Sequence, residues 1–502
     1  MMRAKTIIRY STVLTVVLLI VSGISLTAGL ISVLVFQFNG VKQNSFVTVI
    51  RTPAKKSVTE SAPYIPIKGE FISGTGTPSS ISGTWSNFRG DRHDAIYAES
   101  VKLKKEITDN KPVQLWGLPL GEGFAGAAVR NGRVYLLDYD MEHFRDALRC
   151  LSLDDGKEIW RFSYPVRIKK NHGMSRTVPA VSDKYCVSLG PKCHVLCVDA
   201  ITGTEKWFID LQHDYGTTEP EWYAGQCPLI VSGLNHSGSD NSKTVSDNSK
   251  TVSDAVVLAP AGPEVLLMLV DCETGKEIWR TPNLFGWTMT HSSIIPMDLD
   301  GRKTFVYFGK GGVVGVDALD GNILWSTTDW QIEIATCPSP VILPDNRIFC
   351  CGGYLSGSVM LQIVADSLQP GGYRSTTLYR IKDALFGSEQ QTPIFFDNHL
   401  FGIRQRDKEF VCLNLDGQVV WHSGAQGRFG SGPYILADGM FLILDDNGKL
   451  TACKASITSY EKFFELEVLE GHGCWAPMAM VAGRLLLRDQ LFMICLDLCE
   501  HE

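Results

Sequence analysis

The sequence lacks the local motifs by which many enzymes and metal proteins are recognised. Its 11 histidines form no His-x-x-x-His pair, and its 14 cysteines form no Cys-x-x-Cys pair. Neither a Gly-x-Ser-x-Gly nucleophile motif nor a phosphate-binding glycine loop is present. We therefore expect no metal site, no serine-hydrolase centre and no P-loop nucleotide site.

An excess of positive charge is also missing. Lysine and arginine number 47 against 54 acidic residues, which gives a formal net charge of −7. No basic stripe with interleaved aromatic residues stands out, although such a stripe is typical of nucleic-acid-binding surfaces. We therefore expect no nucleic-acid partner.

Cysteine is absent before Cys150, which excludes a lipidated N-terminal cysteine. The even total could suggest disulfide bridges, but several cysteines lie just before the turn at a strand end, where they behave as small buried hydrophobes. These are Cys150, Cys197, Cys412 and Cys495. We expect core thiols and leave open only the adjacent pair Cys350-Cys351.

Charge is absent from Ser11 to Val41. Residues 13–36 would form a helix about 36 Å long, against a hydrocarbon core of roughly 30 Å. This apolar run is longer than that of a cleaved signal peptide. We predict an N-terminal tail over 1–12 and an uncleaved transmembrane signal anchor over 13–38.

The orientation of this anchor rests on its position in the chain. Positive residues flank both of its ends, so the charge rule does not decide. A short tail ahead of a first hydrophobic segment usually stays in the cytoplasm, so we expect the remainder to be periplasmic, tethered to the inner membrane. Residues 39–84 are rich in Ser, Thr, Pro and Gly and read as a flexible linker. The folded domain is predicted over 85–502.

A long helical period is missing from the folded domain, where short apolar runs alternate with turn signals every 8–12 residues. Asp271 to Trp279 illustrates the repeated unit, a glycine turn followed by an indole in the next strand. The pairs are Gly156–Trp160, Gly203–Trp207, Gly275–Trp279, Gly321–Trp325 and Gly417–Trp421. Five such turns at near-regular intervals indicate a repeat architecture.

The spacing of the aromatic residues gives the number of repeats. Trp116 and Trp160 are 44 residues apart, and Trp279 and Trp325 are 46 apart. A longer gap contains a tandem copy of Asn-Ser-Lys-Thr-Val-Ser-Asp over 241–254, which we interpret as a surface loop. Aromatic residues thus mark eight strands, at Trp116, Trp160, Trp207, Trp279, Trp325, Tyr379, Trp421 and Phe464.

A second series of strands begins with small residues or proline and also numbers eight. The first starts at Ala127, after Trp116, and the last at Ala476, followed by only two further strands. The final unit therefore lacks an outermost strand and the first has one to spare. We predict an all-β, eight-bladed β-propeller of four-stranded antiparallel blades, in which the N-terminal strand at Trp116 closes the last blade.

The glycine–tryptophan turns resemble the "tryptophan docking" motif of the pyrroloquinoline-quinone-like (PQQ-like) β-propeller repeat proteins, Asp…Thr-Gly-Lys-x-x-Trp. Residues 271–279 match it well, and Trp85-x-x-Phe88-Arg89-Gly90 is similar to the segment that opens many bacterial members. The resemblance covers 85–502 and implies that the docking indoles pack between neighbouring blades. These are Trp116, Trp160, Trp207, Trp279, Trp325 and Trp421.

Because such a fold hosts many activities, function has to come from a site. The first hypothesis is a non-catalytic, membrane-tethered scaffold that binds a protein or a polymer such as a polysaccharide at the mouth of the central channel. Side chains just before the small-residue strands would converge there. They are Arg176, Trp222, Gln226, His291, Glu389, Gln390, Gln391 and Trp475.

The second hypothesis is implied by the resemblance alone. Quinoprotein dehydrogenases of this kind oxidise an alcohol or sugar with PQQ and Ca²⁺, and hold the quinone under a vicinal disulfide. Cys350-Cys351 is the possible match, but it lies in an apolar strand typical of core thiols, and no acidic cluster can be assigned to calcium. We prefer the scaffold without a cofactor and keep the PQQ/Ca²⁺-dependent enzyme as the alternative.

Overall fold

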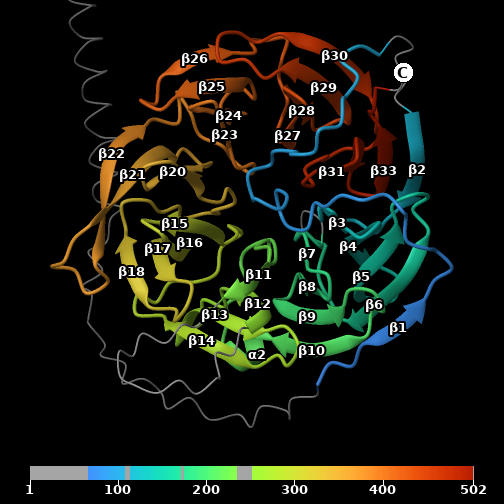
Figure 1. Cartoon of the computed structure of the whole chain (residues 1–502), viewed down its shortest axis with the longest axis horizontal. Helices are drawn as coiled ribbons and strands as arrows, with labels where there is room; N and C mark the ends of the chain where they lie inside the picture. Colours follow the sequence, from blue (N-terminus) through green and yellow to red (C-terminus); the bar gives the residue numbers. More distant parts are fainter. Residues whose placement is uncertain (1–65, 108–112, 171–173, 235–251, 501–502) are drawn as a thin grey trace, which may run out of the picture. The chain divides into compact units, whose positions relative to one another are not determined.

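Eight β-sheets surround a central channel in the computed structural model (Figure 1). They belong to one compact unit that begins at Ile67. The structure describes residues 66–107, 113–170, 174–234 and 252–500. The predicted anchor over 13–38 and most of the predicted linker lie outside these ranges. Within them, no helix has the length and apolarity that crossing a membrane requires.

Each blade is an antiparallel sheet whose strands are numbered from the channel outward (Figure 1). Blade 1 contains β3 (Ala128–Arg130), β4 (Arg133–Asp140), β5 (Arg145–Ser152) and β6 (Glu158–Pro165). Blade 2 contains β7 (Ala180–Val181), β8 (Tyr185–Leu189), β9 (His194–Asp199) and β10 (Glu205–Asp210), followed by the short helix α2 (Leu211–Tyr215). Blade 3 contains β11 (Leu229–Leu234), β12 (Val252–Leu258), β13 (Val265–Asp271) and β14 (Glu277–Pro282).

The next three blades repeat this order. Blade 4 contains β15 (Ile295–Leu299), β16 (Arg302–Gly309), β17 (Gly312–Asp317) and β18 (Ile323–Thr327). Blade 5 contains β19 (Val341–Leu343), β20 (Arg347–Gly352), β21 (Gly357–Ala365) and β22 (Tyr373–Ile381). Blade 6 contains β23 (Ile394–Phe396), β24 (His399–Ile403), β25 (Phe410–Asn414) and β26 (Val419–His422).

The last two blades complete the ring. Blade 7 contains β27 (Tyr434–Ala437), β28 (Met440–Leu444), β29 (Lys449–Lys454) and β30 (Lys462–Glu467). Blade 8 contains β31 (Ala479–Val481), β32 (Arg484–Arg488), β33 (Phe492–Asp497) and, as its outermost strand, β2 (Val113–Pro119). Trp116 pairs with Cys495 in this last ladder. The predicted eight-bladed propeller closed by its N-terminal strand is confirmed, and closure covers the edge of β33.

The folded unit begins earlier than the sequence predicts. Strand β1 (Glu70–Ser73) pairs with β6 and makes blade 1 five-stranded. Further along, the hydroxyl of Ser79 donates to Asp154 at 2.7 Å. The composition of 39–84 indicates a linker because it offers few apolar groups. Strand β1 is nevertheless held, because its backbone hydrogen bonds to the outer edge of β6 require no apolar side chains.

The docking indoles join each blade to the next. In five cases the indole Nε1 donates to a carbonyl beside the next blade's outer turn, at 2.8–3.1 Å. The donor–acceptor pairs are Trp116–Leu153, Trp160–Ile201, Trp207–Cys272, Trp279–Ala318 and Trp421–Ser456. Tyr379 replaces an indole, and its hydroxyl donates to Leu415 at 2.8 Å. The motif is therefore an inter-blade hydrogen bond as well as an apolar contact.

Trp325 departs from this pattern. Its Nε1 is buried and finds no acceptor among the described residues. The outer turn of the next blade lies between β21 and β22, where residues 366–372 form a longer connection than the glycine turns of blades 1 to 4 and 6. One docking indole is therefore held by packing without a hydrogen bond.

The turn glycines explain the constant spacing of the motif. Gly203 has φ +72°, and a Cβ at this position would lie 2.6 Å from Cδ2 of Trp160 in the preceding blade. Gly275 and Gly321 stand in the same relation to Trp207 and Trp279. Each turn glycine therefore contacts the indole of the preceding blade. The strand after the turn carries the indole that contacts the next blade.

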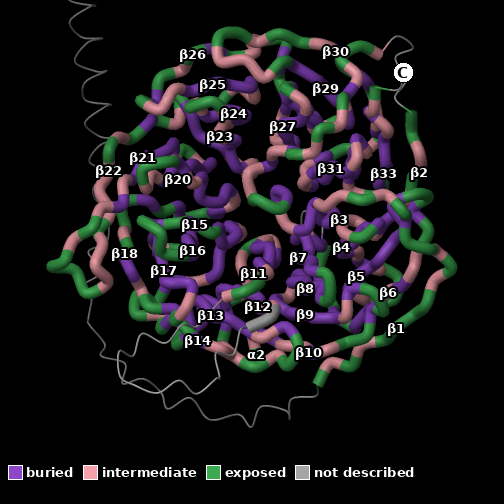
Figure 2. Tube along the Cα trace, viewed as in Figure 1, coloured by how far each residue is buried: buried purple, intermediate pink, exposed green. Residues whose placement is uncertain are grey.

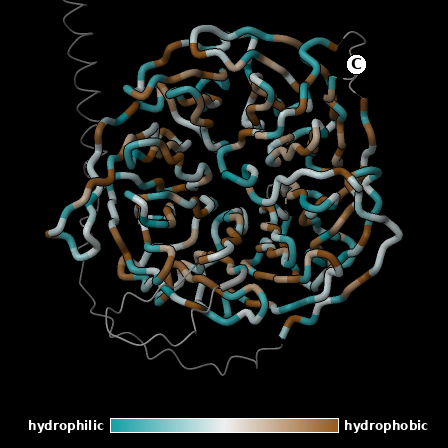
Figure 3. Tube along the Cα trace, viewed as in Figure 1, coloured by the Kyte–Doolittle hydropathy of each residue, from teal (hydrophilic) through white to brown (hydrophobic). Residues whose placement is uncertain are grey.

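The core lies within and between the blades (Figure 2). Hydrophobic segments follow the strands, and many connecting loops are hydrophilic (Figure 3). Cys350 and Cys351 are both free, buried thiols on β20. Consecutive strand residues point to opposite faces, and these two pack into different apolar clusters. The pair left open by the sequence consists of core thiols and does not form a vicinal disulfide.

Residues 85–97, which we call the strap, cross the central channel before β2 begins (Figure 1). Trp85 bridges to β3, and Tyr97 donates its backbone N–H to Leu436 of β27 at 2.8 Å. The guanidinium of Arg89 donates to the carbonyls of Thr392 and Pro393, at 2.5 and 2.9 Å, at the start of β23. The strap therefore links the inner strands of blades 1, 6 and 7.

Candidate functional site

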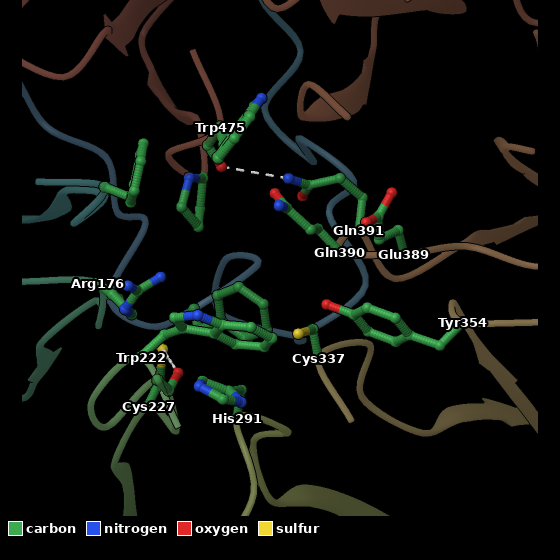
Figure 4. A pocket seen from close by; sticks show the side chains of 14 residues that line it. Arg176, Trp222, Cys227, His291, Cys337, Tyr354, Glu389, Gln390, Gln391 and Trp475 are labelled. Atoms are coloured by element: carbon green, nitrogen blue, oxygen red, sulfur yellow. Dashed lines mark hydrogen bonds between the residues drawn. The ribbon is translucent and has the colours of Figure 1, made fainter. Parts of the chain in front are cut away.

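A cavity of about 270 Å³ lies at the mouth of the central channel (Figure 4). Its walls come from the loops that enter the innermost strands of seven blades, together with the strap. Seven of the eight side chains predicted for the channel mouth line it. They are Arg176, Trp222, His291, Glu389, Gln390, Gln391 and Trp475.

The repeat itself brings these residues together. In each blade the chain returns from the outermost strand to the axis and enters the next innermost strand there. Arg176 precedes β7, His291 precedes β15 and Trp475 precedes β31. Positions that are far apart in sequence therefore meet at one end of the channel.

Gln226 is the predicted residue that the structure places elsewhere. Its side chain is 1% exposed and does not line the cavity. Its Oε1 accepts from the backbone N–H of Ala259 at 3.2 Å, within blade 3. Gln226 therefore lies behind the residues that line the cavity. Its position is fixed by the hydrogen bond to Ala259, which is 33 residues away in the sequence.

One side of the cavity is a stack of flat groups. The rings of Phe124 and Trp475 lie 5.0 Å apart and 25° from parallel. Cζ of Arg176 lies 5.6 Å from the centre of the Phe124 ring. The indole of Trp475 is held in place by a 2.6 Å hydrogen bond from Nε1 to Asp446. Burial lowers the pKa of Arg176 to about 10, so its guanidinium remains charged at neutral pH.

A second pair of rings, Trp222 and His291, lies beside Arg176, with centroids 6.4 Å apart (Figure 4). Trp222 and Tyr223 have φ of +63° and +74°, a left-handed conformation that is unusual for aromatic residues and is concentrated at functional sites. Nε2 of His291 is buried and has no hydrogen-bond partner among the described residues. Burial, and then the charge of Arg176, lower the pKa of His291 to about 4, so the imidazole is neutral.

The opposite wall consists of three consecutive polar residues before β23. Glu389 accepts from Lys408 at 2.9 Å, which offsets its charge. The amide of Gln391 donates to the carbonyls of Ser431 and Trp475, at 3.3 and 3.2 Å, and so ties blades 6, 7 and 8 together. Gln390 lies between them, and its amide points into the cavity (Figure 4).

Several lining residues were not predicted from the sequence, among them Phe88, Phe124, Cys337 and Tyr354. Phe124 and Cys337 lie before innermost strands, but as apolar side chains they carried no signal of a site. Phe88 comes from the strap and Tyr354 from the β20–β21 hairpin, which only the folded chain brings to the mouth. Burial raises the pKa of the Cys337 thiol to about 12, so it is protonated and a poor nucleophile.

The cavity does not fit a quinone held with calcium. Cys350 and Cys351 do not line it, and they lack the disulfide that would cover the cofactor. Among the described residues, no three His, Cys, Asp or Glu side chains cluster so that they could hold a metal ion. The lining instead offers aromatic faces with a few polar groups, an arrangement that suits binding.

Fold and repeat define the class of this protein as an eight-bladed β-propeller. A family model described as "Outer membrane protein assembly factor BamB" matches residues 230–361, which span blades 3 and 4 and most of the first three strands of blade 5. No curated protein sequence matches the chain.

Three solved structures are similar to this chain at low sequence identity. BamB from Moraxella catarrhalis is 13% identical, with a TM-score of 0.49, and the alignment covers 77% of this chain and 100% of that one. The quinohemoprotein alcohol dehydrogenase from Comamonas testosteroni is 13% identical, with a TM-score of 0.42 and coverage of 84% and 81%. A computationally designed protein, Ika8, is 13% identical, with a TM-score of 0.45 and coverage of 76% and 99%.

Proposed function

We propose that this chain is a non-catalytic scaffold that binds a protein or polymer ligand at its channel mouth. In this proposal residues 13–38 anchor the chain in the inner membrane, and the propeller lies in the periplasm. The observation that carries the proposal is the cavity itself. The cavity is lined by different side chains from seven of the eight blades, whereas the docking residues between the blades recur around the ring.

The lining favours binding over reaction. The neutral imidazole of His291 lies beside Arg176, so it does not form a carboxylate–histidine pair, and the Cys337 thiol is protonated. Aromatic faces and uncommitted polar groups in a concave site are typical of ligand recognition. The family model that matches blades 3 to 5 is named for an assembly factor, which supports a scaffold role.

The dehydrogenase alternative has no specific observation in its favour. Incubating the full-length protein with PQQ and Ca²⁺ and measuring dye reduction with alcohols and sugars tests it directly. We expect no reduction above that of a heat-denatured control. A quinone absorbance that remains with the purified protein would favour the enzyme.

Photo-crosslinking in host cells tests the scaffold proposal. A photoreactive amino acid replaces Gln390 inside the cavity or Leu355, which is 83% exposed next to Tyr354. The matched control position is Leu378 on the outer strand β22, which is 49% exposed. We expect discrete adducts from the two mouth positions and none from Leu378. If neither mouth position forms an adduct, the proposal is wrong.

A further inference from the structure

The cavity at the channel mouth is closed from within by the strap and the residues beside it. The backbone N–H of Ser79 donates to Gly132 in the β3–β4 turn, and that of Leu103 donates to Asp438 in the β27–β28 turn. Both turns join the first strand of a blade to its second, so they lie at the end of the channel opposite the mouth. The chain therefore enters from that end, lines the cavity with Phe88 and returns. Such a blind cavity admits a side chain or a chain end and does not let a polymer thread through the channel.

The open space of the cavity suits one large apolar side chain. Four aromatic residues of the lining are only partly buried, namely Phe88, Trp222, Tyr354 and Trp475. A cavity of about 150 Å³ is enough to hold a benzene molecule, and this one measures about 270 Å³. The volume is therefore sufficient for the side chain of phenylalanine, leucine or tryptophan.

The charged groups of the lining are already engaged. Cζ of Arg176 lies 5.6 Å from the centre of the Phe124 ring, and Glu389 accepts from Lys408 at 2.9 Å. A charged side chain that entered the cavity would lose its water beside groups that already have partners, which costs free energy. We therefore expect the inserted group to be uncharged.

The loops at the mouth end of the propeller carry exposed apolar side chains. Among the described residues, eight large hydrophobic side chains are exposed in these loops and two in the turns at the opposite end. The eight are Met141, Phe144, Leu284, Phe285, Ile334, Leu355, Leu385 and Leu491, and the two are Ile201 and Leu368.

Two of these side chains lie beside the cavity. Leu355 follows Tyr354 of the lining, and Ile334 lines a smaller hollow of about 100 Å³ that shares His291 with the cavity. Exposed apolar surface with polar groups around it marks protein interaction sites. The surroundings of the cavity therefore favour a protein over a polysaccharide.

Two polar groups of the lining suit the backbone of such a partner. The amide of Gln390 and the hydroxyl of Tyr354 make no hydrogen bond among the described residues, and both point into the open space (Figure 4). An amide side chain both donates and accepts, so it can pair with the N–H and the C=O of a peptide backbone. Burial raises the pKa of Tyr354 to about 12, so its hydroxyl stays neutral and can also do both.

We infer that the channel mouth binds a segment of a partner protein and takes one large, uncharged apolar side chain of that segment into the cavity. The backbone of the segment lies across the mouth and pairs with Gln390 and Tyr354. Its flanking residues contact Leu355 and Ile334. This inference rests on the proposed function and names the ligand class of the same site.

A display library of random dodecapeptides, selected on the full-length protein, tests the ligand class. The protein is held in lipid nanodiscs, because detergent would itself fill an apolar cavity. We expect the bound peptides to share one large apolar position. Replacing that residue by serine in a synthetic, labelled peptide should weaken binding about tenfold or more in an anisotropy titration, because the buried anchor is lost. Peptides that share a charged residue instead would overturn the inference.

Two exposed leucines give a matched pair of variants that should both fold. Leu355→Ser, beside the cavity, should weaken binding of the selected peptide several-fold, and Leu378→Ser, on the outer strand β22, should leave it unchanged. Gln390→Trp should abolish binding because the indole fills the cavity. Equal affinities for the two serine variants, or full binding to Gln390→Trp, would place the peptide elsewhere and contradict the inference.

A negative selection separates this inference from the scaffold proposal. Maltohexaose and trigalacturonate are titrated in parallel as a neutral and an acidic oligosaccharide. If no library peptide binds, the inference fails. The scaffold proposal then stands if an oligosaccharide binds or the position-390 crosslinker forms an adduct, and both proposals fail if neither happens.

Discussion

The outer ring and the channel mouth are built from the same repeat but differ in what they keep constant. At the ring, indoles from five blades donate to carbonyls of the next blade at 2.8–3.1 Å, and a tyrosine does so in a sixth. At the mouth, the equivalent position varies between blades and carries, for example, Arg176, His291 or Trp475. We expect the same residue type at equivalent positions where every blade packs against its neighbour in the same way. We expect different residues where the blades together bind one asymmetric ligand.

Removing a docking indole should have the largest effect on stability. Trp160 is 2% exposed, and Trp160→Ala should lower the free energy of unfolding by about 3–5 kcal/mol because it leaves a large cavity between two blades. The matched change at the mouth, Trp222→Ala, should cost about 1 kcal/mol or less. Denaturant unfolding of both variants measures the difference, and equal losses would contradict the contrast between ring and mouth.

Replacing a turn glycine should cause the next largest loss of stability. Gly203 and Gly439 have nearly the same φ, +72° and +73°, but only at Gly203 would a Cβ meet another atom within 4 Å, in the indole of Trp160. Gly439→Ala should cost about 1–2 kcal/mol for its left-handed backbone. Gly203→Ala should cost about 1–3 kcal/mol more, because it overpacks the docking contact. Equal costs in thermal or denaturant unfolding would show that the indole does not depend on the glycine.

A polar contact between blades 1 and 2 should make stability depend on pH. Asp146 is fully buried and accepts from Tyr164 at 2.7 Å and from Ser175 at 2.8 Å. Burial raises the pKa of Asp146 from 3.8 to about 6, so the unfolded chain ionises first as the pH rises. The stability contributed by the neutral carboxyl is present below about pH 4 and is lost between about pH 4 and pH 6.

Asp146→Asn removes that ionisation. Relative to the variant, the natural chain should lose about 2–3 kcal/mol across this pH window and then stay level above it. Urea unfolding at a series of pH values gives the two curves. Parallel curves would mean that Asp146 does not ionise in this range.

The smallest expected effect is a difference in the free energy of unfolding between variants of two docking indoles. Trp279 donates to Ala318 at 3.1 Å, whereas Nε1 of Trp325 has no acceptor among the described residues. Both are replaced by phenylalanine. Trp279→Phe should cost about 1 kcal/mol more than Trp325→Phe, because it alone leaves a carbonyl without its donor. A larger loss at Trp325 would contradict the role of the hydrogen bond.

Much of the ring could be predicted from the sequence because its determinants are local. A glycine turn and an indole four residues later recur in one register, and the order of the two strand series shows which strand closes the ring. Strand β1 could not be predicted, since its four residues are all exposed and it pairs only because β6 offers an edge. The linker composition of 39–84 concealed it.

The mouth was predicted in part for the same reason. Polar and aromatic residues just before innermost strands could be named, because the repeat places that position at the axis. Gln226 satisfies the same rule, but a backbone group from another part of blade 3 buries it. Phe88 and Tyr354 arrive from the strap and from a hairpin, so no local pattern indicates them.

The most direct test of the contrast is the crosslinking yield of a photoreactive residue at position 390, measured in two second-site variants of the full-length chain. Trp160→Phe weakens the ring and should leave the yield unchanged. Trp222→Ala leaves the ring intact and should abolish the adduct. Loss of the adduct in Trp160→Phe together with its retention in Trp222→Ala would contradict the assignment of structure to the ring and of binding to the mouth.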